Sequence, residues 1–322
     1  MVAFMEKLHQ KPVISPYLGL TLGVLAVSTA SIFIRFAQEE VASIVVAAWR
    51  MTVAVFVLFP VVWFKYRTEI VNLSRRDLGL TFMAGVFLAI HFAAWISSLQ
   101  YTSVVSSVVL VTTTPLWVAI AAPIAIKEPI TRLVGLGLLI SLAGTLVVGF
   151  SDACTFGNGI VCPPISEFVQ GKSFLGNFLA LLGAWVAAGY VIIGRSVREK
   201  LAVVPYIFLV YGFSALILLA MALFSGQPLV GFSGDSYLWL ILLGLVPQLI
   251  GHSIYNWSLG YLPAAFVAIT LLGEPIGTSV LAYILLGETP GWIKSLGGVL
   301  ILGGIVITSL NVKAKSEISK IE

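Results

Sequence analysis

Long apolar runs separated by short charged stretches are the feature that most constrains this chain. Each run is about 20 residues long, the length that a helix needs to cross the hydrocarbon core of a bilayer. Only 10% of the 322 residues are charged, and the mean hydropathy is +1.05. In a soluble domain, about a quarter of the residues would be charged. We therefore expect lipid to surround most of the chain.

Ten segments suit membrane-spanning helices. Their residues are uniformly apolar rather than alternating, which excludes a transmembrane barrel. The first run continues without a small-residue cleavage site, so it predicts a retained helix and no removed signal peptide. The expected spans are residues 16–36, 41–64, 78–99, 103–126, 132–150, 174–194, 203–225, 237–258, 262–286 and 291–311. We expect an all-α, multi-pass protein of a bacterial or archaeal cytoplasmic membrane.

The basic residues predict the orientation of these spans. With the N-terminus inside, fourteen Lys and Arg fall on cytoplasmic segments, whereas Arg35, Lys172 and Lys294 fall on the opposite side. This asymmetry follows the positive-inside rule and puts both termini in the cytoplasm. It also explains the net charge of +4, so no acidic partner is implied. The sequence has no basic run and no Gly-rich phosphate loop, so nucleic-acid binding and P-loop chemistry have no support.

Both cysteines, Cys154 and Cys162, fall in the outer loop between the fifth and sixth spans. That side is the oxidising one, so a disulfide is one expectation and two free thiols are the alternative. No metal-ligand or nucleophile–base cluster occurs in the sequence. We expect no metal, no cofactor and no enzyme activity.

The sequence repeats itself at an offset of 160 residues. Distinctive residues recur at this spacing, including Pro115 with Pro275, Glu128 with Glu288, Gly137 with Gly297, and Gly144 with Gly304. Residues 16–150 and 174–311 are therefore expected to be two five-helix repeats. Because five is odd, the second copy enters the membrane from the opposite face. Inverted repeats are typical of alternating-access transporters, whose substrate site lies near the midplane between the repeats.

This pattern resembles the drug/metabolite transporter superfamily, EamA type. The resemblance covers nearly the whole chain. It depends on the five-plus-five organisation, on AAWRM (47–51), and on TPLWVAIAAPIAIKEPIT (114–131) and EPIGTSVLAYILLGETPG (274–291). It implies a central cavity lined by spans one to four and six to nine, and exchange of small metabolites, often outward. The small four-helix relatives couple to protons through a Glu in the first span. No Glu occurs there in this chain, so that mechanism is not carried over.

Arg50 and Glu274 are the two formally charged residues well inside the expected spans. Such groups are costly in a bilayer and normally face a cavity or a partner. By helical rise, Arg50 lies about 13 Å and Glu274 about 18 Å from the outer side, so an ion pair is possible. One interpretation is a structural pair. In the other, Arg50 binds a substrate carboxylate while Glu274 releases Arg50 or binds an amine. A zwitterion such as an amino acid would satisfy both groups.

Polar and aromatic residues form stripes on the third and eighth spans. His91 and Trp95 share one helix face, and Gln248, His252 and Tyr255 share another. Trp95 and Tyr255 correspond at the 160-residue offset, so they are expected to face each other across the axis and to line a substrate pocket. Anchoring at the membrane interface is the alternative. His91 could carry a coupled proton, or it could be a hydrogen-bonded structural histidine.

Pro115 and Pro275 interrupt the fourth and ninth spans. Proline frees backbone carbonyls that lipid cannot satisfy, so such breaks are tolerated where they line a water-filled space. We therefore assign Thr114 to the substrate-binding residues and both prolines to the hinges, with a simple kink as the alternative for Pro115. Glu128 and Glu288 end these spans at opposite interfaces and are expected to be gate or loop anchors.

The sequence predicts a secondary transporter that moves a small metabolite by alternating access. Export of an amino acid or a related zwitterion or amphiphile is the first expectation. Organic acids, sugars or nucleotide-type metabolites and cationic drugs are alternative substrates, and a channel or a scaffold is a remote alternative. The expected partners are the substrate, the lipid bilayer and, in one version, a coupled proton. Glycines at seven-residue spacing in the fifth and tenth spans allow close helix packing, either on the bundle or in a homodimer. The chain is expected to be a monomer or a homodimer.

Overall fold

The computed structural model describes residues 14–125, 132–156, 160–162, 164–198, 201–258 and 273–318. Within them, the regular structure is helical apart from one short antiparallel hairpin of β1 (Thr155–Phe156) and β2 (Ile160–Val161). The helices of the first half are α2 (Pro16–Ser28), α3 (Ala30–Ala37), α4 (Ser43–Lys65), α5 (Arg67–Val71), α6 (Arg75–Ser98), α7 (Val104–Val111), α8 (Thr114–Ala125) and α9 (Arg132–Ala153). Those of the second half are α10 (Ile165–Gln170), α11 (Lys172–Arg198), α12 (Val203–Phe224), α13 (Gly234–Leu243), η1 (Gly244–His252), α14 (Ser253–Ser258), α16 (Gly273–Leu286) and α17 (Trp292–Ile318).

Each of the ten expected spans contains helical residues, which confirms the predicted helical fold. Six segments are long and apolar enough to cross a bilayer, namely Pro16–Ala37, Ser43–Lys65, Arg75–Ser98, Lys172–Arg198, Val203–Phe224 and Gly234–Ser258. Shorter apolar helices occupy the other four spans, at Val104–Val118, Gly135–Val148, Gly273–Leu286 and Trp292–Ile307. The ninth span is described only from Gly273. The full count of ten crossings and the side on which each terminus lies therefore stay predictions.

Threonines divide the first and fourth spans into two helices each. Thr29 separates α2 from α3, and its Oγ1 donates a hydrogen bond to Ala26 O at 2.7 Å. Thr112 and Thr113 separate α7 from α8, and both hydroxyls donate to carbonyl oxygens of α7. These side chains satisfy backbone oxygens near the breaks, which is why an interruption is tolerated inside a spanning segment.

The two repeated prolines lie in the first turns of helices. Pro115 is the second residue of α8, and Pro275 is the third residue of α16. A first turn accommodates proline because the N–H groups there have no intrahelical partner. The hinge role expected for both prolines stays a prediction.

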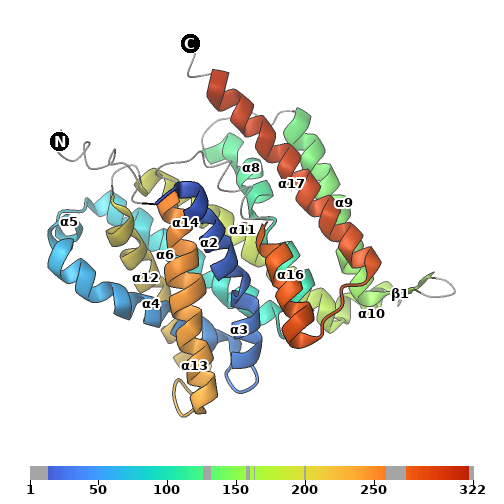
Figure 1. Ribbon diagram of the computed structural model, residues 1–322, viewed down its shortest axis with the longest axis horizontal. Coiled ribbons are helices and arrows are strands. Elements are labelled where there is room, and N and C mark those ends of the chain that lie inside the picture. Colours follow the sequence, from blue (N-terminus) through green and yellow to red (C-terminus); the bar gives the residue numbers. More distant parts are fainter. Residues whose placement is uncertain are drawn as a thin grey trace.

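Helices α9 and α17 pack closely at the glycines that recur in the sequence (Figure 1). A Cβ atom added at Gly144 would lie 2.6 Å from Gly297 O, and one added at Gly304 would collide with Gly137 O. Only glycine allows the two backbones to approach this closely. Of the two roles left open for these glycines, helix packing within the chain is the one that the structure contains.

The same interface contains a two-fold relation between the repeats. Ser141 Oγ donates to Ile301 O at 3.2 Å, and these residues are 160 positions apart. A residue meets its own equivalent only on or beside a two-fold axis. The contacts of residue 144 with 297 and of residue 137 with 304 run in opposite directions, so the helices are antiparallel. This is the arrangement that inverted repeats require.

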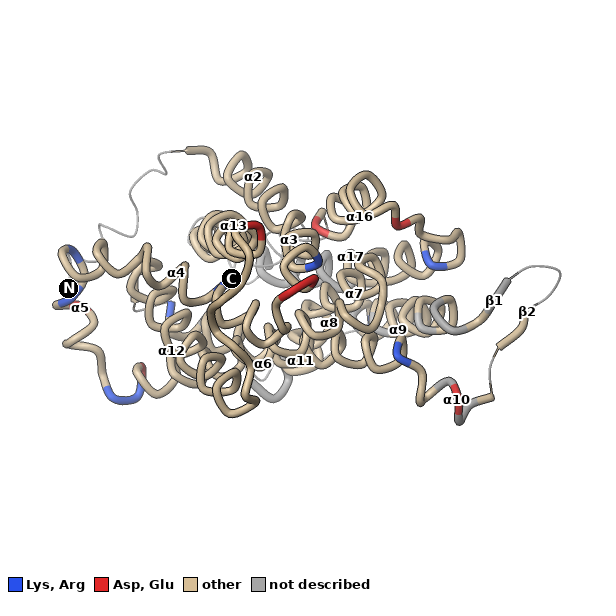
Figure 2. The backbone as a smooth tube through the Cα atoms, turned by 90° about the horizontal axis from the view of Figure 1, so that it is seen from below, with Lys and Arg blue, Asp and Glu red and all other residues tan. Residues whose placement is uncertain are grey.

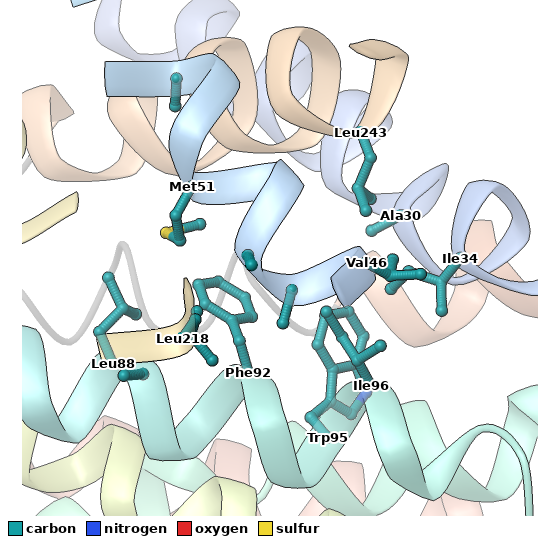
Figure 3. Packing of buried hydrophobic residues seen from close by; sticks show 14 of the residues in the cluster. Ala30, Ile34, Val46, Met51, Leu88, Phe92, Trp95, Ile96, Leu218 and Leu243 are labelled. Atoms are coloured by element: carbon teal, nitrogen blue, oxygen red, sulfur yellow. The ribbon is translucent and has the colours of Figure 1, made fainter. Parts of the chain in front are cut away.

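The buried core lies between α3, α4, α6, α12 and α13. Figure 3 shows Phe92, Trp95 and Ile96 projecting from α6 toward α4, which contributes Val46 and Met51. Many outward-facing side chains are also large and apolar, as expected where the solvent is lipid. Figure 2 shows the charged residues mainly at helix ends and connecting segments.

The segment between α9 and α11 contains the short hairpin. The structure joins Cys154 and Cys162, which flank this hairpin, in a disulfide. The disulfide is therefore the state that the structure contains, and not the two free thiols.

Candidate functional site

Arg50 is the centre of the candidate site. It lies in the N-terminal half of α4 with none of its surface exposed. Its Nε donates a hydrogen bond to Gln248 Oε1 at 2.7 Å. The guanidinium carbon lies 4.2 Å from the centre of the Phe92 ring and 5.7 Å from that of Trp95. Aromatic faces attract cations, so these rings stabilise the buried charge without accepting conventional hydrogen bonds from its Nη1 and Nη2 atoms.

Several buried hydrogen-bond donors around Arg50 lack partners. Among the residues that the structure describes, no hydrogen bond reaches Arg50 Nη1 or Nη2, Gln248 Nε2, Trp95 Nε1 or the Tyr255 hydroxyl. Buried polar groups are normally satisfied, because an unmade hydrogen bond costs free energy in a low-dielectric environment. The centre therefore has an excess of donors and suits a ligand that accepts hydrogen bonds, such as a carboxylate.

A π-helix brings Gln248 to Arg50. Residues Gly244–His252 form this wider turn between α13 and α14, and it contains Pro247. A Cβ atom added at Gly244 would lie 2.6 Å from Val53 Cβ and 3.2 Å from Arg50 O. Glycine thus allows the π-helix to approach α4, one helical turn before Gln248. π-helical turns are frequent at functional sites.

Phe92 and His252 meet across the interface of the repeats. Their ring centres are 5.8 Å apart, and they are equivalent residues at the 160-residue offset. The pair expected there was Trp95 with Tyr255, which lies three residues further along both helices. No ring contact joins Trp95 to Tyr255 in the described part of the chain, whereas Tyr255 contacts His252 at 6.3 Å. The aromatic pair that meets at the axis therefore lies one turn before Trp95 and Tyr255, and the pocket role of these two residues stays a prediction.

His91 connects this aromatic group to α11. Its Nδ1 lies 2.9 Å from Gly183 O, and its ring stacks on Trp95 with centres 6.0 Å apart. A carbonyl oxygen can only accept, so Nδ1 carries the proton and Nε2 is left as an acceptor in the neutral ring. This bond is what a structural histidine would make, and the coupled-proton role stays a prediction.

Glu274 lies near Arg50 without pairing directly with it. It occupies the first turn of α16 and is half-buried. The two charges interact electrostatically, but no N–O distance of 4.0 Å or less joins them. The backbone around Glu274 is held on α2, because Thr278 Oγ1 donates to Ser28 O at 3.0 Å. The direct ion pair considered from the sequence is thus absent in this conformation, and Glu274 is left for another partner.

Thr114 and Glu288 make their hydrogen bonds with residues other than those around Arg50. Thr114 Oγ1 donates to Val111 O at 2.9 Å, within its own helix pair, and no hydrogen bond in the described ranges joins it to Arg50. Glu288 accepts from Val104 N at 3.0 Å and pairs with Arg35 Nη2 at 3.2 Å. It therefore connects the end of the ninth span to α3 and to the start of α7, and its role as a gate or loop anchor stays a prediction. Glu128, its counterpart, lies outside the described residues.

Two contributors to the site were missed from the sequence. Phe92 covers the guanidinium, but a phenylalanine in an apolar run is indistinguishable from core. The π-helix was also missed, although Gly244 and Pro247 in the middle of the eighth span were a usable signal for irregular backbone.

Comparisons with known proteins agree with this architecture. A sequence model of the EamA-like transporter family matches residues 14–150 and 174–310. The chain is 22% identical over 296 residues to an uncharacterized transporter of Archaeoglobus fulgidus, covering 91% of this chain and 96% of that protein. It is 25% identical over 246 residues to the uncharacterized transporter YdfC of Bacillus subtilis, covering 76% of this chain and 75% of that protein. A solved crystal structure matches with a TM-score of 0.62 at 17% identity, covering 93% of this chain and 98% of the other, which is a likeness of fold.

Proposed function

Because the chain belongs to the EamA-like transporter family, we propose that it is a secondary transporter of a small carboxylate-bearing metabolite. An amino acid is the first candidate, and export is the proposed direction. The family and the apolar helices make the chain an integral, multi-pass membrane protein. The substrate class and the alternating-access mechanism are our proposal.

A carboxylate substrate is supported by the two buried nitrogens of Arg50 that make no hydrogen bond within the described residues. Arg50 Nε is already bonded to Gln248, so Nη1 and Nη2 are the nitrogens left for a ligand. A carboxylate bound there would accept two hydrogen bonds and neutralise a buried charge. Leaving this charge unpaired is costly, so an anionic ligand would gain affinity from relieving that cost.

Glu274 favours a zwitterion over a simple anion. It is half-buried, interacts electrostatically with Arg50 and forms no salt bridge in the described part of the chain. An ammonium group beside the bound carboxylate could pair with it. A cationic substrate without a carboxylate would leave the donors of Arg50 unsatisfied and would add a second positive charge.

Alternating access is supported by the two-fold relation of the repeats. Equivalent residues meet at Ser141–Ile301 and at Phe92–His252. Two inverted copies can exchange conformations and so open the site first to one side and then to the other. The candidate centre contains Phe92 and His252, so it lies where such an exchange would expose it in turn.

The test is a ligand panel on the purified protein. Thermal shifts are measured with amino acids, organic acids, sugars, nucleosides and organic cations, and uptake of the stabilising compounds is then followed in proteoliposomes. We expect amino acids to stabilise and to be transported by the wild type, and Arg50→Gln to lose both effects. Glu274→Gln should weaken amino acids more than organic acids. Transport of sugars or cations with no effect of any carboxylate would contradict the proposal.

A further inference from the structure

Three tyrosines line one side of the helix bundle between Arg50 and the ends of α11 and α12. Tyr211 lies close to Gln248 and Ser253 and interacts electrostatically with Arg50. Tyr206 lies further along, close to Tyr190. Both Tyr206 and Tyr211 are only 1% exposed. We call Tyr190, Tyr206, Tyr211 and Asn256, together with Ser214 one turn after Tyr211 on α12, the tyrosine cluster.

The hydroxyls of this cluster are mostly unsatisfied. Tyr190 and Asn256 hydrogen-bond at 3.3 Å, and Asn256 Nδ2 donates to His252 O at 2.8 Å. In contrast, the hydroxyls of Tyr206, Tyr211 and Ser214 make no hydrogen bond of good length and angle within the described residues, although Tyr206 lies beside Tyr190, and Tyr211 beside Gln248 and Ser253. Buried hydroxyls without partners are unfavourable, so a ligand or water is expected to reach them.

The other repeat shows that the fold does not need these hydroxyls. The equivalent positions, 160 residues earlier, are all apolar and fully buried: Ala30, Val46, Met51, Ala54 and Ile96. Figure 3 shows four of them, Ala30, Val46, Met51 and Ile96, within the packed core. The five equivalent positions are therefore apolar core residues in the first repeat and polar residues in the second. Packing explains the first set and leaves the hydroxyls of the second unexplained.

The position of the cluster relates it to the Arg50 centre. Gln248 contacts both Arg50 and Tyr211, so the cluster begins where the candidate carboxylate site ends. It extends to Tyr206, in the first turn of α12. The distribution of basic residues predicts that this end of α12 is cytoplasmic.

We propose that the tyrosine cluster is a second subsite, which holds the hydrogen-bonding end of a substrate whose carboxylate lies on Arg50. This inference rests on the proposed function. Hydroxyls both donate and accept, so the subsite suits a hydroxyl or an amide group on the substrate. An apolar analogue would leave Tyr211 and Ser214 unpaired, and a site of this kind discriminates against it strongly.

Matched ligand pairs test the subsite. The pairs are threonine with valine, and 4-hydroxybutyrate with valerate in case the carboxylate is not an amino acid. We expect the wild type to bind the hydroxylated member of a pair about tenfold or more tightly. Tyr211→Phe removes one oxygen and should reduce this ratio toward one, by weakening the hydroxylated ligand and leaving the other within about twofold. Tyr283→Phe, at a 60% exposed position of α16, is the control and should keep the ratio.

The outcomes separate the subsite from the carboxylate site. A ratio that Tyr211→Phe leaves unchanged, with Arg50→Gln still abolishing binding, would overturn the subsite alone. Binding of both members of a pair that survives Arg50→Gln would overturn the carboxylate site instead. A wild type without preference for either hydroxylated ligand also overturns the subsite.

Thiol labelling gives a second readout that does not depend on the ligand pairs. The two cysteines of the chain are joined in a disulfide, so an introduced cysteine is the one free thiol. We expect a charged, membrane-impermeant thiol reagent to label Ser214→Cys from the side of Arg198, and bound threonine to slow the reaction severalfold. Leu216→Cys, at a 66% exposed position on the same helix, should face lipid and stay unlabelled. Equal labelling of the two cysteines, or none at Ser214→Cys, would overturn the proposal.

Discussion

At the scale of single residues, charge carries the most information in this chain. Arg50 and Glu274 could be identified from the sequence because ionisable groups inside apolar runs are rare. The role of Phe92 could not, because its chemistry matches that of its neighbours. Which aromatic pair meets at the axis also depends on helix rotation. That rotation is set by packing between helices. The offset of 160 residues therefore identifies which residues are equivalent, but it does not show that Phe92 and His252 are the equivalent pair in contact.

Arg50→Lys should impair substrate binding although it keeps the positive charge. Lysine cannot donate to Gln248 and to both oxygens of a carboxylate with a planar fork. We expect the dissociation constant of the transported carboxylate to rise about 10- to 100-fold, or ~1.4–2.8 kcal/mol. The measurement is isothermal calorimetry on purified protein, with exposed Arg76→Lys as the control. Wild-type affinity in Arg50→Lys would mean that only the charge matters.

At the scale of elements, hydropathy located the spans but not their irregularities. Thr29, Thr112 and Thr113 interrupt helices, but they lower the hydropathy of their spans too little to reveal the breaks. The π-helix also depends on local backbone contacts. Gly244 allows it to approach α4 closely, and a hydropathy profile does not detect such a contact. The close packing of α9 on α17 could be predicted from the sequence, because regularly spaced glycines allow two helix backbones to approach closely.

Gly244→Ala tests whether the π-helix positions Gln248. The new methyl group would lie 2.6 Å from Val53 Cβ, so the π-helix must move away from α4. We expect weaker ligand binding together with a loss of about 1–3 kcal/mol of stability. Gly212→Ala is the matched control, because nothing lies within 4 Å of the added Cβ. Thermal unfolding and ligand titration measure both effects, and equal behaviour of the two variants would argue against the positioning role.

Gly304→Ala should weaken the contact between the repeats, whereas the neighbouring Gly303→Ala should not. A Cβ at Gly304 would lie 2.9 Å from Ser141 N, but at Gly303 no atom is within 4 Å. Backbone atoms cannot yield as a side chain can, so we expect Gly304→Ala to cost about 1–3 kcal/mol. Thermal unfolding in detergent compares the two alanines. A similar melting temperature for both would show that α9 and α17 separate easily.

Glu40 couples the loop after α3 to the start of α13 in a pH-dependent way. Its carboxylate accepts from Ser233 N at 2.9 Å, Ser233 Oγ at 2.7 Å and Ser236 Oγ at 2.6 Å. The hydroxyl of Ser236, followed by the groups of Ser233, holds the pKa of Glu40 below its ordinary value of 4.5. A lowered folded-state pKa stabilises the protein above pH 4.5, and the gain is lost as the pH falls through the folded pKa. Melting temperatures of wild type and Glu40→Gln should therefore differ at pH 7 and converge in acid; a gap that is independent of pH would contradict this.

At the scale of the whole molecule, the repeats share a fold and differ in chemistry. Equivalent positions meet at the axis, yet the positions of Val46, Met51 and Ala54 are apolar where those of Tyr206, Tyr211 and Ser214 are polar. An exact copy would offer the same surroundings to a ligand from either side. This chain does not, so the two halves of the proposed route make different contacts with a substrate. Duplication explains the common backbone, and we expect any substrate specificity to arise from the side chains in which the repeats differ.

Glu288→Gln should favour opening of the outer side. Glu288 connects the second repeat to the first, through Arg35 at 3.2 Å and Val104 N at 3.0 Å, so its charge stabilises the conformation in which these ends are together. A partly exposed ion pair contributes only about 0.2–1 kcal/mol. The population of the open state, and with it the outer labelling rate of a Ser31→Cys probe buried one turn before Arg35, should therefore rise about 1.5- to 5-fold. Exposed Glu39→Gln is the control for the loss of one negative charge. If both variants label the probe at the wild-type rate, the contact at Glu288 holds a loop in place and takes no part in the exchange between the two sides.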